Sequence, residues 1–256
     1  MELTAVTYNV RHAILDDGPG WDARRAGVAR RLRAADADIV ALQECDGHQR
    51  AALAEALPDY EWCGESPASE VGNPNPIGCG PDWTVDRAET VWLSESGDPG
   101  TVGWDAAYPR VLTAAVVNHR ATGRSVAVYN THFDHVGREA RRESARVLRS
   151  MVDDIPGGWP AVLLGDFNTE PGRPAYERLV GDRGGRTVAD ARAVASESTG
   201  PDTTLTDFES LRDGRRVDHV FVTAEWTVSR HEVDATRTDE RYPSDHLPVR
   251  VEVSLD

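Results

Sequence analysis

Short apolar runs that end abruptly in polar side chains constrain the fold of this 256-residue chain more than any other feature. Most runs contain adjacent Val, Leu, Ile or Ala residues rather than a strict alternation of apolar and polar residues. Such runs are typical of strands that are buried on both faces of a sheet. The strand-like runs lie near residues 3–9, 38–43, 111–118, 125–131, 160–165, 216–222 and 247–253.

Helical patterns separate these runs. Segments 23–35 and 46–57 are predicted to be helices, and segment 137–155 is the longest. In that last segment apolar residues recur at three- and four-residue steps, with Arg and Glu on the opposite face. Because strand and helix alternate in each half, the pattern predicts an α/β chain of two similar halves.

The tips of the predicted strands carry side chains that suit chemistry rather than packing. Asn9 closes the first run, Glu44 follows the second, and Asp166 follows the run that includes residues 162–164. Carboxylate, amide and imidazole groups in this combination suit a hard divalent cation and a phosphate ester. The other polar residues at strand ends are Asn130, His132, Asn168, Asp218, Asp245 and His246.

Four of these residues can be interpreted from their positions alone. Glu44 is the best candidate metal ligand, because a Glu at the end of a buried run would otherwise waste a buried position. The alternative is a surface acid at a strand exit. Asn9 could complete the site without adding charge, or it could form a turn. Asp166 and Asn168 are two residues apart, so both project to the same side of an extended segment. An Asx-turn explains that spacing as well.

The motifs together resemble those of the endonuclease/exonuclease/phosphatase superfamily, whose DNase I-like members include abasic-site endonucleases, neutral sphingomyelinases, inositol polyphosphate 5-phosphatases and deadenylases. All of them occur in the family's order, from Asn9 to Pro248. Segment 129–135, followed by an Arg/Glu-rich helix, is similar to that of an uncharacterised bacterial and archaeal branch. The motifs are Thr7–Asn9, Leu42–Glu44, Asn130–His132, Gly165–Asn168, Asp218–His219 and Ser244–Pro248.

The resemblance implies a fold and a cofactor. The expected architecture is an α/β, DNase I-like four-layer sandwich in which two packed β-sheets are flanked by α-helices, with residues 1–256 forming a single domain. The expected cofactor is Mg²⁺ or Mn²⁺, held by Glu44 and Asn9 with Asp245 as a second carboxylate on the metal side.

The resemblance also implies catalytic roles. Asp166 is expected to orient or deprotonate the attacking water, and Asn168 to bind a phosphate oxygen. His246 is expected to bind the non-bridging phosphate oxygen and to take charge in the transition state. Its tautomer needs a carboxylate partner, which is Asp218 in the family's pattern.

Three further residues are expected near the phosphate. His132 is implied as an additional phosphate-contacting donor, and Asn130 as a residue that holds His132 or the substrate. Arg110 opens a strand and could clamp a phosphate, although a structural ion pair explains an Arg there nearly as well. His135 lies close enough to His132 in the sequence to line the same cleft, but its role stays open, as do those of His12 and His48.

The charge composition is unusual. The formal net charge is −15, with 25 Asp and 18 Glu, and all 28 basic residues are Arg. Asp-rich surfaces without Lys are similar to those of proteins from salt-accumulating halophiles, whereas codon preference explains missing Lys but not excess acid. At molar salt the Debye length falls to about 3 Å. Net charge therefore does not exclude nucleic acid as a substrate.

Several functions remain open from the sequence. The site suits a metal-dependent phosphoesterase that attacks a phosphodiester, as a nuclease does, or a phosphomonoester, with in-line attack by water. A soluble phosphatase or a phospholipid or sphingomyelin phosphodiesterase is an alternative, although no basic amphipathic helix marks a membrane-surface enzyme. A catalytically inactive binding module of the same fold is a second alternative. Neither Gly-x-Ser-x-Gly nor His-Glu-x-x-His occurs in the chain.

Cellular context and loops give weaker predictions. No apolar run approaches the roughly 18 residues that span a bilayer, and the first residues contain no secretion signal. We therefore expect a cytoplasmic monomer without membrane insertion, whose partner is a phosphate-ester substrate, with nucleic acid among the candidates. The cysteines are expected to be reduced thiols.

Segments 64–88 and 196–206 are predicted to be loops. The first is either a surface loop or a substrate-facing flap. A strand pair that the related branch is expected to have before Thr90 is predicted to be missing.

Overall fold

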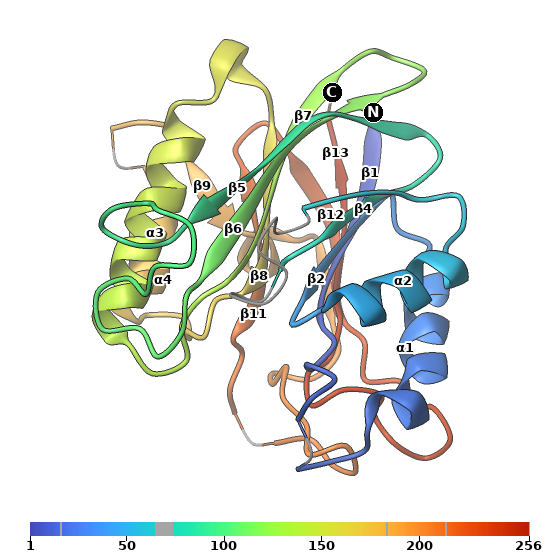
Figure 1. Cartoon of the computed structure of the whole chain (residues 1–256). Coiled ribbons are helices and arrows are strands. Elements are labelled where there is room, and N and C mark those ends of the chain that lie inside the picture. Colours follow the sequence, from blue (N-terminus) through green and yellow to red (C-terminus); the bar gives the residue numbers. More distant parts are fainter. Residues whose placement is uncertain (16, 65–73, 183, 213, 256) are drawn as a thin grey trace.

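The computed structural model describes residues 1–15, 17–64, 74–182, 184–212 and 214–255. Two β-sheets lie face to face at the centre, and helices cover the outer face of each sheet (Figure 1). The order of layers is therefore helix, sheet, sheet and helix, which confirms the four-layer sandwich predicted from the sequence. No helix among the described residues is long and apolar enough to cross a membrane.

The first sheet has seven strands and is built around the N-terminal strand. In this sheet β1 runs parallel to β2 and antiparallel to β13. Its strand order is β10 (Glu197–Thr199), β12 (Thr227–Val233), β13 (Val249–Ser254), β1 (Glu2–Asn9), β2 (Ile39–Gln43), β4 (Ile77–Cys79) and β3 (Glu61–Cys63).

The second sheet has six strands. In this sheet β7 and β8 are parallel, and β11 runs antiparallel to β8. Its strand order is β5 (Trp83–Trp92), β6 (Val111–His119), β7 (Ser125–His132), β8 (Ala161–Asp166), β11 (Asp218–Thr223) and β9 (Val188–Asp190).

The helices form the two outer layers (Figure 1). The seven-stranded sheet is covered by α1 (Trp21–Ala35) and α2 (Gly47–Ala56), whose first turn is closed by a capping box between Asp46 and Gln49. The six-stranded sheet is covered by α3 (Arg138–Asp153) and α4 (Pro174–Leu179). The short elements are η1 (Pro156–Gly158) and α5 (Ala191–Val194).

Three apolar cores match these layers. The central core joins the two sheets, and the two outer cores join each sheet to its helices. Strands β1, β2, β7 and β8 are buried on both faces, which is why their sequences read as continuous apolar runs. The central core includes Leu3, Ile39, Trp83, Leu164, Val220 and Val249.

Two loop predictions were wrong in part. Within segment 64–88, β4 forms and Trp83 begins β5, while residues 65–73 lie outside the described residues. The antiparallel pair β3 and β4 precedes Thr90, where we expected a strand pair to be missing. Segment 196–206 contains β10, a three-residue strand parallel to β12.

Candidate functional site

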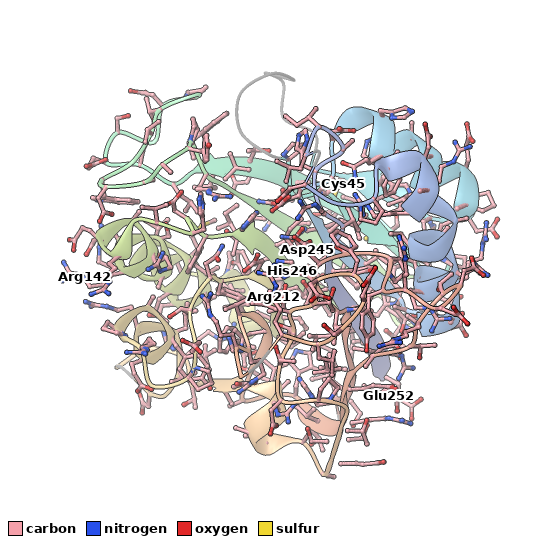
Figure 2. The ribbon with its side chains drawn as sticks, turned by 90° about the horizontal axis from the view of Figure 1, so that it is seen from below. Cys45, Arg142, Arg212, Asp245, His246 and Glu252 are labelled. Atoms are coloured by element: carbon pink, nitrogen blue, oxygen red, sulfur yellow. The ribbon has the colours of Figure 1, made fainter. Side chains whose placement is uncertain are left out.

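The predicted site residues converge where the strands of both sheets stop. Asn9 is the last residue of β1, His132 the last of β7 and Asp166 the last of β8. In the six-stranded sheet the register places His132 and Asp218 directly beside Asp166, one on each side. Figure 2 looks onto this end of the molecule, where Asp245 and His246 lie near the middle of the face.

Glu44, Asn9 and Asp166 meet across the two sheets. The amide nitrogen of Asn9 lies 3.2 Å from Glu44 Oε1 and 3.1 Å from Asp166 Oδ2. The other oxygen of Glu44 accepts a hydrogen bond of 2.8 Å from the backbone amide of His12. Glu44 has a positive φ of 56°, which non-glycine residues adopt rarely.

These oxygen-bearing side chains fit a hard divalent cation. The carboxylates of Glu44 and Asp166 converge on the Asn9 amide nitrogen, whereas the Asn9 side-chain oxygen accepts a hydrogen bond of 2.9 Å from the backbone amide of Arg11. Mg²⁺ is bound through few carboxylates while it keeps several waters, so the two carboxylates suit it, and Asn9 would present its oxygen to the cation only after its amide turns over. Asp166, Asp218 and His246 also bring one ligand atom each within 4.8 Å of one another. Asp218 is already bonded to the imidazole of His246, however, so that group orients a histidine, and we regard the Glu44 side as the metal side.

His246 is held between two carboxylates. Its Nδ1 lies 2.9 Å from Asp218 Oδ2, and its Nε2 lies 3.7 Å from Asp166 Oδ2. Burial alone would lower the pKa of His246, but the charges of Asp218 and Asp166 raise it well above its ordinary value. The imidazole is therefore positively charged at neutral pH, as the predicted role in binding a phosphate oxygen requires.

Asp166 is the carboxylate whose charge is least favoured. Burial and the neighbouring charge of Asp218 raise the pKa of Asp166 to about 7, although His246 and the amides of Asn168 and Asn9 oppose the shift. A carboxylate with a pKa near neutrality suits a general base.

Asn168 forms the turn that follows Asp166. Its backbone amide donates to Asp166 Oδ1 at 3.0 Å, which is the Asx-turn that the sequence left open, and its φ is 47°. Its side-chain amide donates to the carbonyl of Phe133 at 2.9 Å. The turn is thereby tied to the end of β7.

His132 lies behind Asp166 and Glu44. Its Nε2 is 3.3 Å from Asp166 Oδ2, and its Nδ1 is 4.0 Å from Glu44 Oε1. Burial, followed by the positive charges of Arg110, His246 and His135, lowers the pKa of His132 well below its ordinary value. Unlike His246, this imidazole is neutral.

Asp245 lies beside this cluster and is paired with a residue that the sequence analysis passed over. Its Oδ2 accepts a hydrogen bond from Arg11, whose other terminal nitrogen binds Asp17. The Arg11 side chain is 8% exposed, so its charge is largely withdrawn from water. The only sequence signal was its place two residues after Asn9. The metal-side role of Asp245 stays a prediction, with Arg11 as its present partner.

Asn130 and Arg110 are placed differently from the rest. The Asn130 amide is fully buried, donates to the carbonyls of Leu42 and Pro76 at 2.9 Å, and accepts from Gln43 at 2.7 Å. It therefore ties the two sheets together beneath the site, with its side chain directed to protein partners. Arg110 is buried against Asp134, with 3.3 Å between Nε and Oδ2, which is the structural ion pair considered above.

Comparison with known proteins agrees with this geometry. The model of the Endonuclease/Exonuclease/phosphatase family matches residues 6–246. The chain belongs to this family. Its motifs and its strand-end cluster are thus those of a family member, and the resemblance inferred from sequence is confirmed.

Solved structures of family members are similar over the whole chain. A Bacteroides vulgatus endonuclease/exonuclease/phosphatase is 32% identical, covers 100% of both chains and has a TM-score of 0.92. The mannosyl-6-phosphatase Bt3783 of Bacteroides thetaiotaomicron is 31% identical, covers 99% of this chain and 100% of its own, and has a TM-score of 0.90.

Similarity to curated sequences is lower. Drosophila melanogaster nocturnin is 24% identical over an alignment of 275 residues that covers 92% of this chain. The chain spans 42% of the length of nocturnin, and 60% of a related protein of Acanthamoeba polyphaga mimivirus.

A buried network behind the site was also missed by the sequence analysis. Asp190 accepts hydrogen bonds from Tyr176 at 2.8 Å and Arg216 at 2.9 Å, and it lies 3.7 Å from His219. His219 is fully buried, and its Nε2 lies 2.9 Å from the carbonyl oxygen of Thr169. In this family member the network thus supports the turn that carries Asn168.

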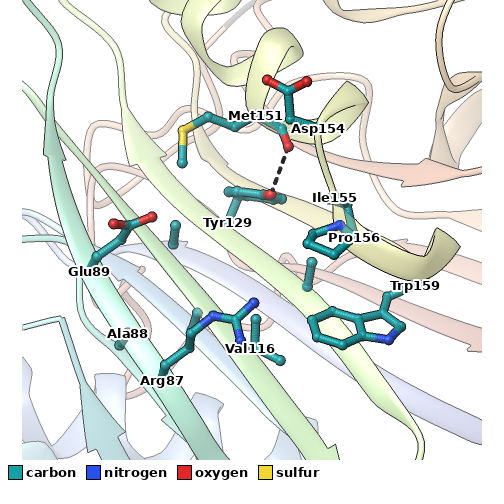
Figure 3. Close-up of a pocket in the computed structure, with 13 residues that line it drawn as sticks. Arg87, Ala88, Glu89, Val116, Tyr129, Met151, Asp154, Ile155, Pro156 and Trp159 are labelled. Atoms are coloured by element: carbon teal, nitrogen blue, oxygen red, sulfur yellow. Dashed lines mark hydrogen bonds between the residues drawn. The ribbon is translucent and has the colours of Figure 1, made fainter.

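A cavity of about 460 Å³ lies on the outer face of the six-stranded sheet, between β5–β7 and the end of α3 (Figure 3). Arg87 lies 5.4 Å over the ring of Trp159, and Tyr129 donates a hydrogen bond to the carbonyl of Met151. The described residues that line this cavity include none of the strand-end cluster. The candidate site is therefore defined by the strand ends, not by this cavity.

Proposed function

We propose that this family member is a divalent-metal-dependent phosphoesterase that hydrolyses its substrate by in-line attack of water. The observation that carries the proposal is the array formed by Asp218, a charged His246 and Asp166, with Glu44 and Asn9 on the far side of Asp166. Among the side chains of this array none is a Ser or Cys nucleophile, so water is the expected attacking group.

The metal side of the proposal rests on Glu44 and Asn9. These residues would hold Mg²⁺ or Mn²⁺, with Asp245 as a further carboxylate. When bound, the cation neutralises charge on the phosphoryl oxygens and on the departing oxygen.

The remaining residues act on the water and the phosphoryl group. Asp166 orients the water and accepts its proton. His246 donates from Nε2 to a non-bridging oxygen whose charge grows in the transition state, and Asp218 fixes the proton on Nδ1. Asn168 donates one side-chain amide hydrogen to a second phosphate oxygen, while its other amide hydrogen stays bonded to the carbonyl of Phe133. The neutral His132 would supply a further hydrogen-bond donor to the phosphate.

Among phosphate esters we propose a phosphomonoester as the substrate. The support is the 31% identity over nearly the whole chain to a protein described as a mannosyl-6-phosphatase. The net charge of −15 agrees with a small soluble substrate better than with a nucleic-acid strand, outside molar salt.

Hydrolysis by metal-depleted protein, before and after Mg²⁺ or Mn²⁺ is added, tests this function. It is measured as inorganic phosphate from phosphomonoesters, as shortened strands from nucleic acids and as phosphocholine from sphingomyelin. Hexose 6-phosphates, single-stranded DNA and RNA, and sphingomyelin vesicles are supplied in parallel, in dilute buffer and in molar KCl. We expect activity only with added metal, and only on the phosphomonoesters. Cleavage of the nucleic acids or vesicles alone would replace the proposed substrate, and full activity in excess chelator would refute the mechanism. Inactivity on all substrates would favour a binding module.

A further inference from the structure

An exposed aromatic pair stands at the rim of the strand-end cluster. The side chain of Tyr108 is 62% exposed and that of His135 is 51% exposed. Their ring centroids are 6.0 Å apart with an angle of 16° between the planes, so the rings are stacked. A large aromatic residue that is left mostly in water beside a catalytic cluster suggests a surface for a ligand.

The pair is held by a buried ion pair rather than by loose surface contacts. Arg110 is 6% exposed, and one of its terminal nitrogens lies 3.1 Å from His135 Nδ1. Its Nε donates to Asp134, whose other oxygen accepts from the backbone amides of Val136 and Gly137 at 2.9 and 2.7 Å. The position of the His135 ring is therefore set in advance, which lowers the entropic cost of binding.

The pair also adjoins the catalytic residues. His135 follows His132, the last residue of β7, by three positions, and Arg110 directly precedes β6. Because Leu112 of β6 pairs with Thr131 of β7, Arg110 lies beside the end of β7 that carries His132. The carbonyl of Phe133, between His132 and the pair, accepts the amide hydrogen of Asn168.

Apolar side chains extend this rim. Val136, next to His135, is 60% exposed, and Ile14, in the loop that leaves β1 after Asn9, is 79% exposed. Both loops start from the end of the sheets at which the catalytic side chains lie. The loops that start at this end of the sheets thus carry exposed apolar side chains, which would suit the carbon skeleton of a leaving alcohol better than a second phosphate.

We propose that Tyr108 and His135 form the leaving-group subsite, and that this subsite receives the sugar ring of a phosphomonoester. The proposal rests on the phosphoesterase function proposed above and names its substrate class. The C–H face of a sugar ring packs on the exposed face of Tyr108, while the stacked ring of His135 supports Tyr108 from the opposite face. One stacked pair accommodates one ring, whereas a nucleic-acid strand needs successive stacking surfaces and a basic groove.

Tyr108→Ala and Tyr108→Phe test the subsite on three phosphomonoesters. The substrates are a hexose 6-phosphate, acyclic glycerol 3-phosphate and a nucleoside 5′-monophosphate. We expect Tyr108→Ala to raise KM for the hexose phosphate by about five- to tenfold, the range that a lost aromatic contact gives. Its kcat, and all constants for glycerol 3-phosphate, should stay within about twofold of the wild type by the same scale. Tyr108→Phe keeps the ring and should stay close to the wild type, and His135→Ala should follow Tyr108→Ala.

The outcomes separate the subsite from the function. If Tyr108→Ala loses activity equally on all three substrates, or loses none, the subsite is refuted. Hydrolysis of the phosphomonoesters by the wild type would still support the proposed function. If Tyr108→Ala loses activity only on the nucleoside 5′-monophosphate, the subsite binds a nucleobase and not a sugar ring. If the wild type hydrolyses nothing, the function fails, and calorimetric titration of hexose 6-phosphate into wild type and Tyr108→Ala still decides the subsite. Equal affinities for the two proteins would refute it.

Discussion

Asp166 is the residue on which most interactions of the site converge, and its position costs free energy in the absence of metal. Its carboxylate lies between Asn9, His132 and His246, and burial raises its pKa to about 7. A group whose folded pKa is raised above its unfolded value of about 3.9 disfavours the folded state when it is ionised.

Asp166→Asn should therefore separate catalysis from stability. We expect turnover to fall by about 10²- to 10⁴-fold, as for loss of a general base, while the metal-free protein stays as stable as the wild type or becomes more stable at pH 8. Steady-state rates and chemical unfolding on the same preparation measure both. Asp59→Asn, in the exposed turn after α2, is the control and should change neither. Lower stability of Asp166→Asn would show that the carboxylate holds the fold.

The site could be predicted residue by residue only where the side chain stands at a strand tip. Glu44 and Asp166 follow buried runs and His246 directly precedes one, and those places in the sequence are visible. Asn130 stands in the same kind of place, yet its amide faces the opposite sheet. Polarity at a strand end does not tell which way a side chain points. Arg11 was missed because Asp245, the carboxylate that joins it to the cluster, lies more than two hundred residues away.

Strand β8 approaches β7 unusually closely where the catalytic turn begins. A Cβ atom on Gly165 would lie 2.2 Å from the backbone carbonyl oxygen of Thr131. Backbone cannot give way as a flexible side chain can, so only glycine lets Asp166 and His132 lie side by side in register.

Gly165→Ala should accordingly destabilise the protein by about 1–3 kcal/mol, the usual cost of overpacking, and should reduce turnover because Asp166 is displaced. Thermal unfolding and steady-state rates measure the two effects. The control is Gly47→Ala in the first turn of α2, where an added Cβ meets nothing within 4 Å. An unchanged melting temperature for Gly165→Ala would contradict the close approach.

The network around Asp190 gives a prediction for acid. Burial would raise the pKa of Asp190, but His219, Arg216 and Tyr176 hold it well below its ordinary value. A depressed carboxylate pKa contributes stability that is present above the unfolded pKa of about 3.9 and is lost as the pH falls through the folded pKa.

Asp190→Asn should therefore be less stable than the wild type near pH 7, and the difference should shrink as the pH falls from about 5 toward 2. Urea unfolding of both proteins across this range measures the difference. A gap that stays constant down to pH 2 would mean that Asp190 acts through its shape and not through its charge.

Most strands that sequence reasoning found are buried on both faces, whereas the strands it missed lie at a sheet edge or next to an edge strand. The edge strand β5 is exposed in its middle and is interrupted by a register shift after Val85. Strands β3, β4, β9 and β10 have three residues each, too few to establish a pattern. In β12 buried and exposed residues alternate, with Arg230 and Glu232 among them. A search for continuous apolar runs excludes such strands by design.

At the scale of the whole molecule, the charge of −15 is the dominant property. Many of the 28 Arg residues pair with carboxylates, for example Arg30 with Asp239 and Arg186 with Glu225. The excess acid nevertheless has no basic partner, so the folded state carries net self-repulsion.

If this composition is an adaptation to high salt, the melting temperature should rise steeply between dilute buffer and molar KCl, where the Debye length falls to about 3 Å. Thermal unfolding across a KCl series measures the rise, and the same series in Na₂SO₄ distinguishes screening from the general effect of a strongly excluded salt. A melting temperature that does not change with KCl would favour codon preference as the explanation of the composition. It would also strengthen the argument against nucleic acid as the substrate.

The hydrogen bonds that build the cluster join one sheet to the other: Asn9 reaches Asp166, and His246 reaches Asp218. Neither sheet alone therefore holds a working set of groups. Because β1, made first, pairs with β13, which follows His246, a growing chain stays chemically inert until that distant segment has been synthesised and docked. Under the proposed function, hydrolysis of phosphate esters is expected only from the fully assembled chain, and a chain truncated before His246 is expected to show none.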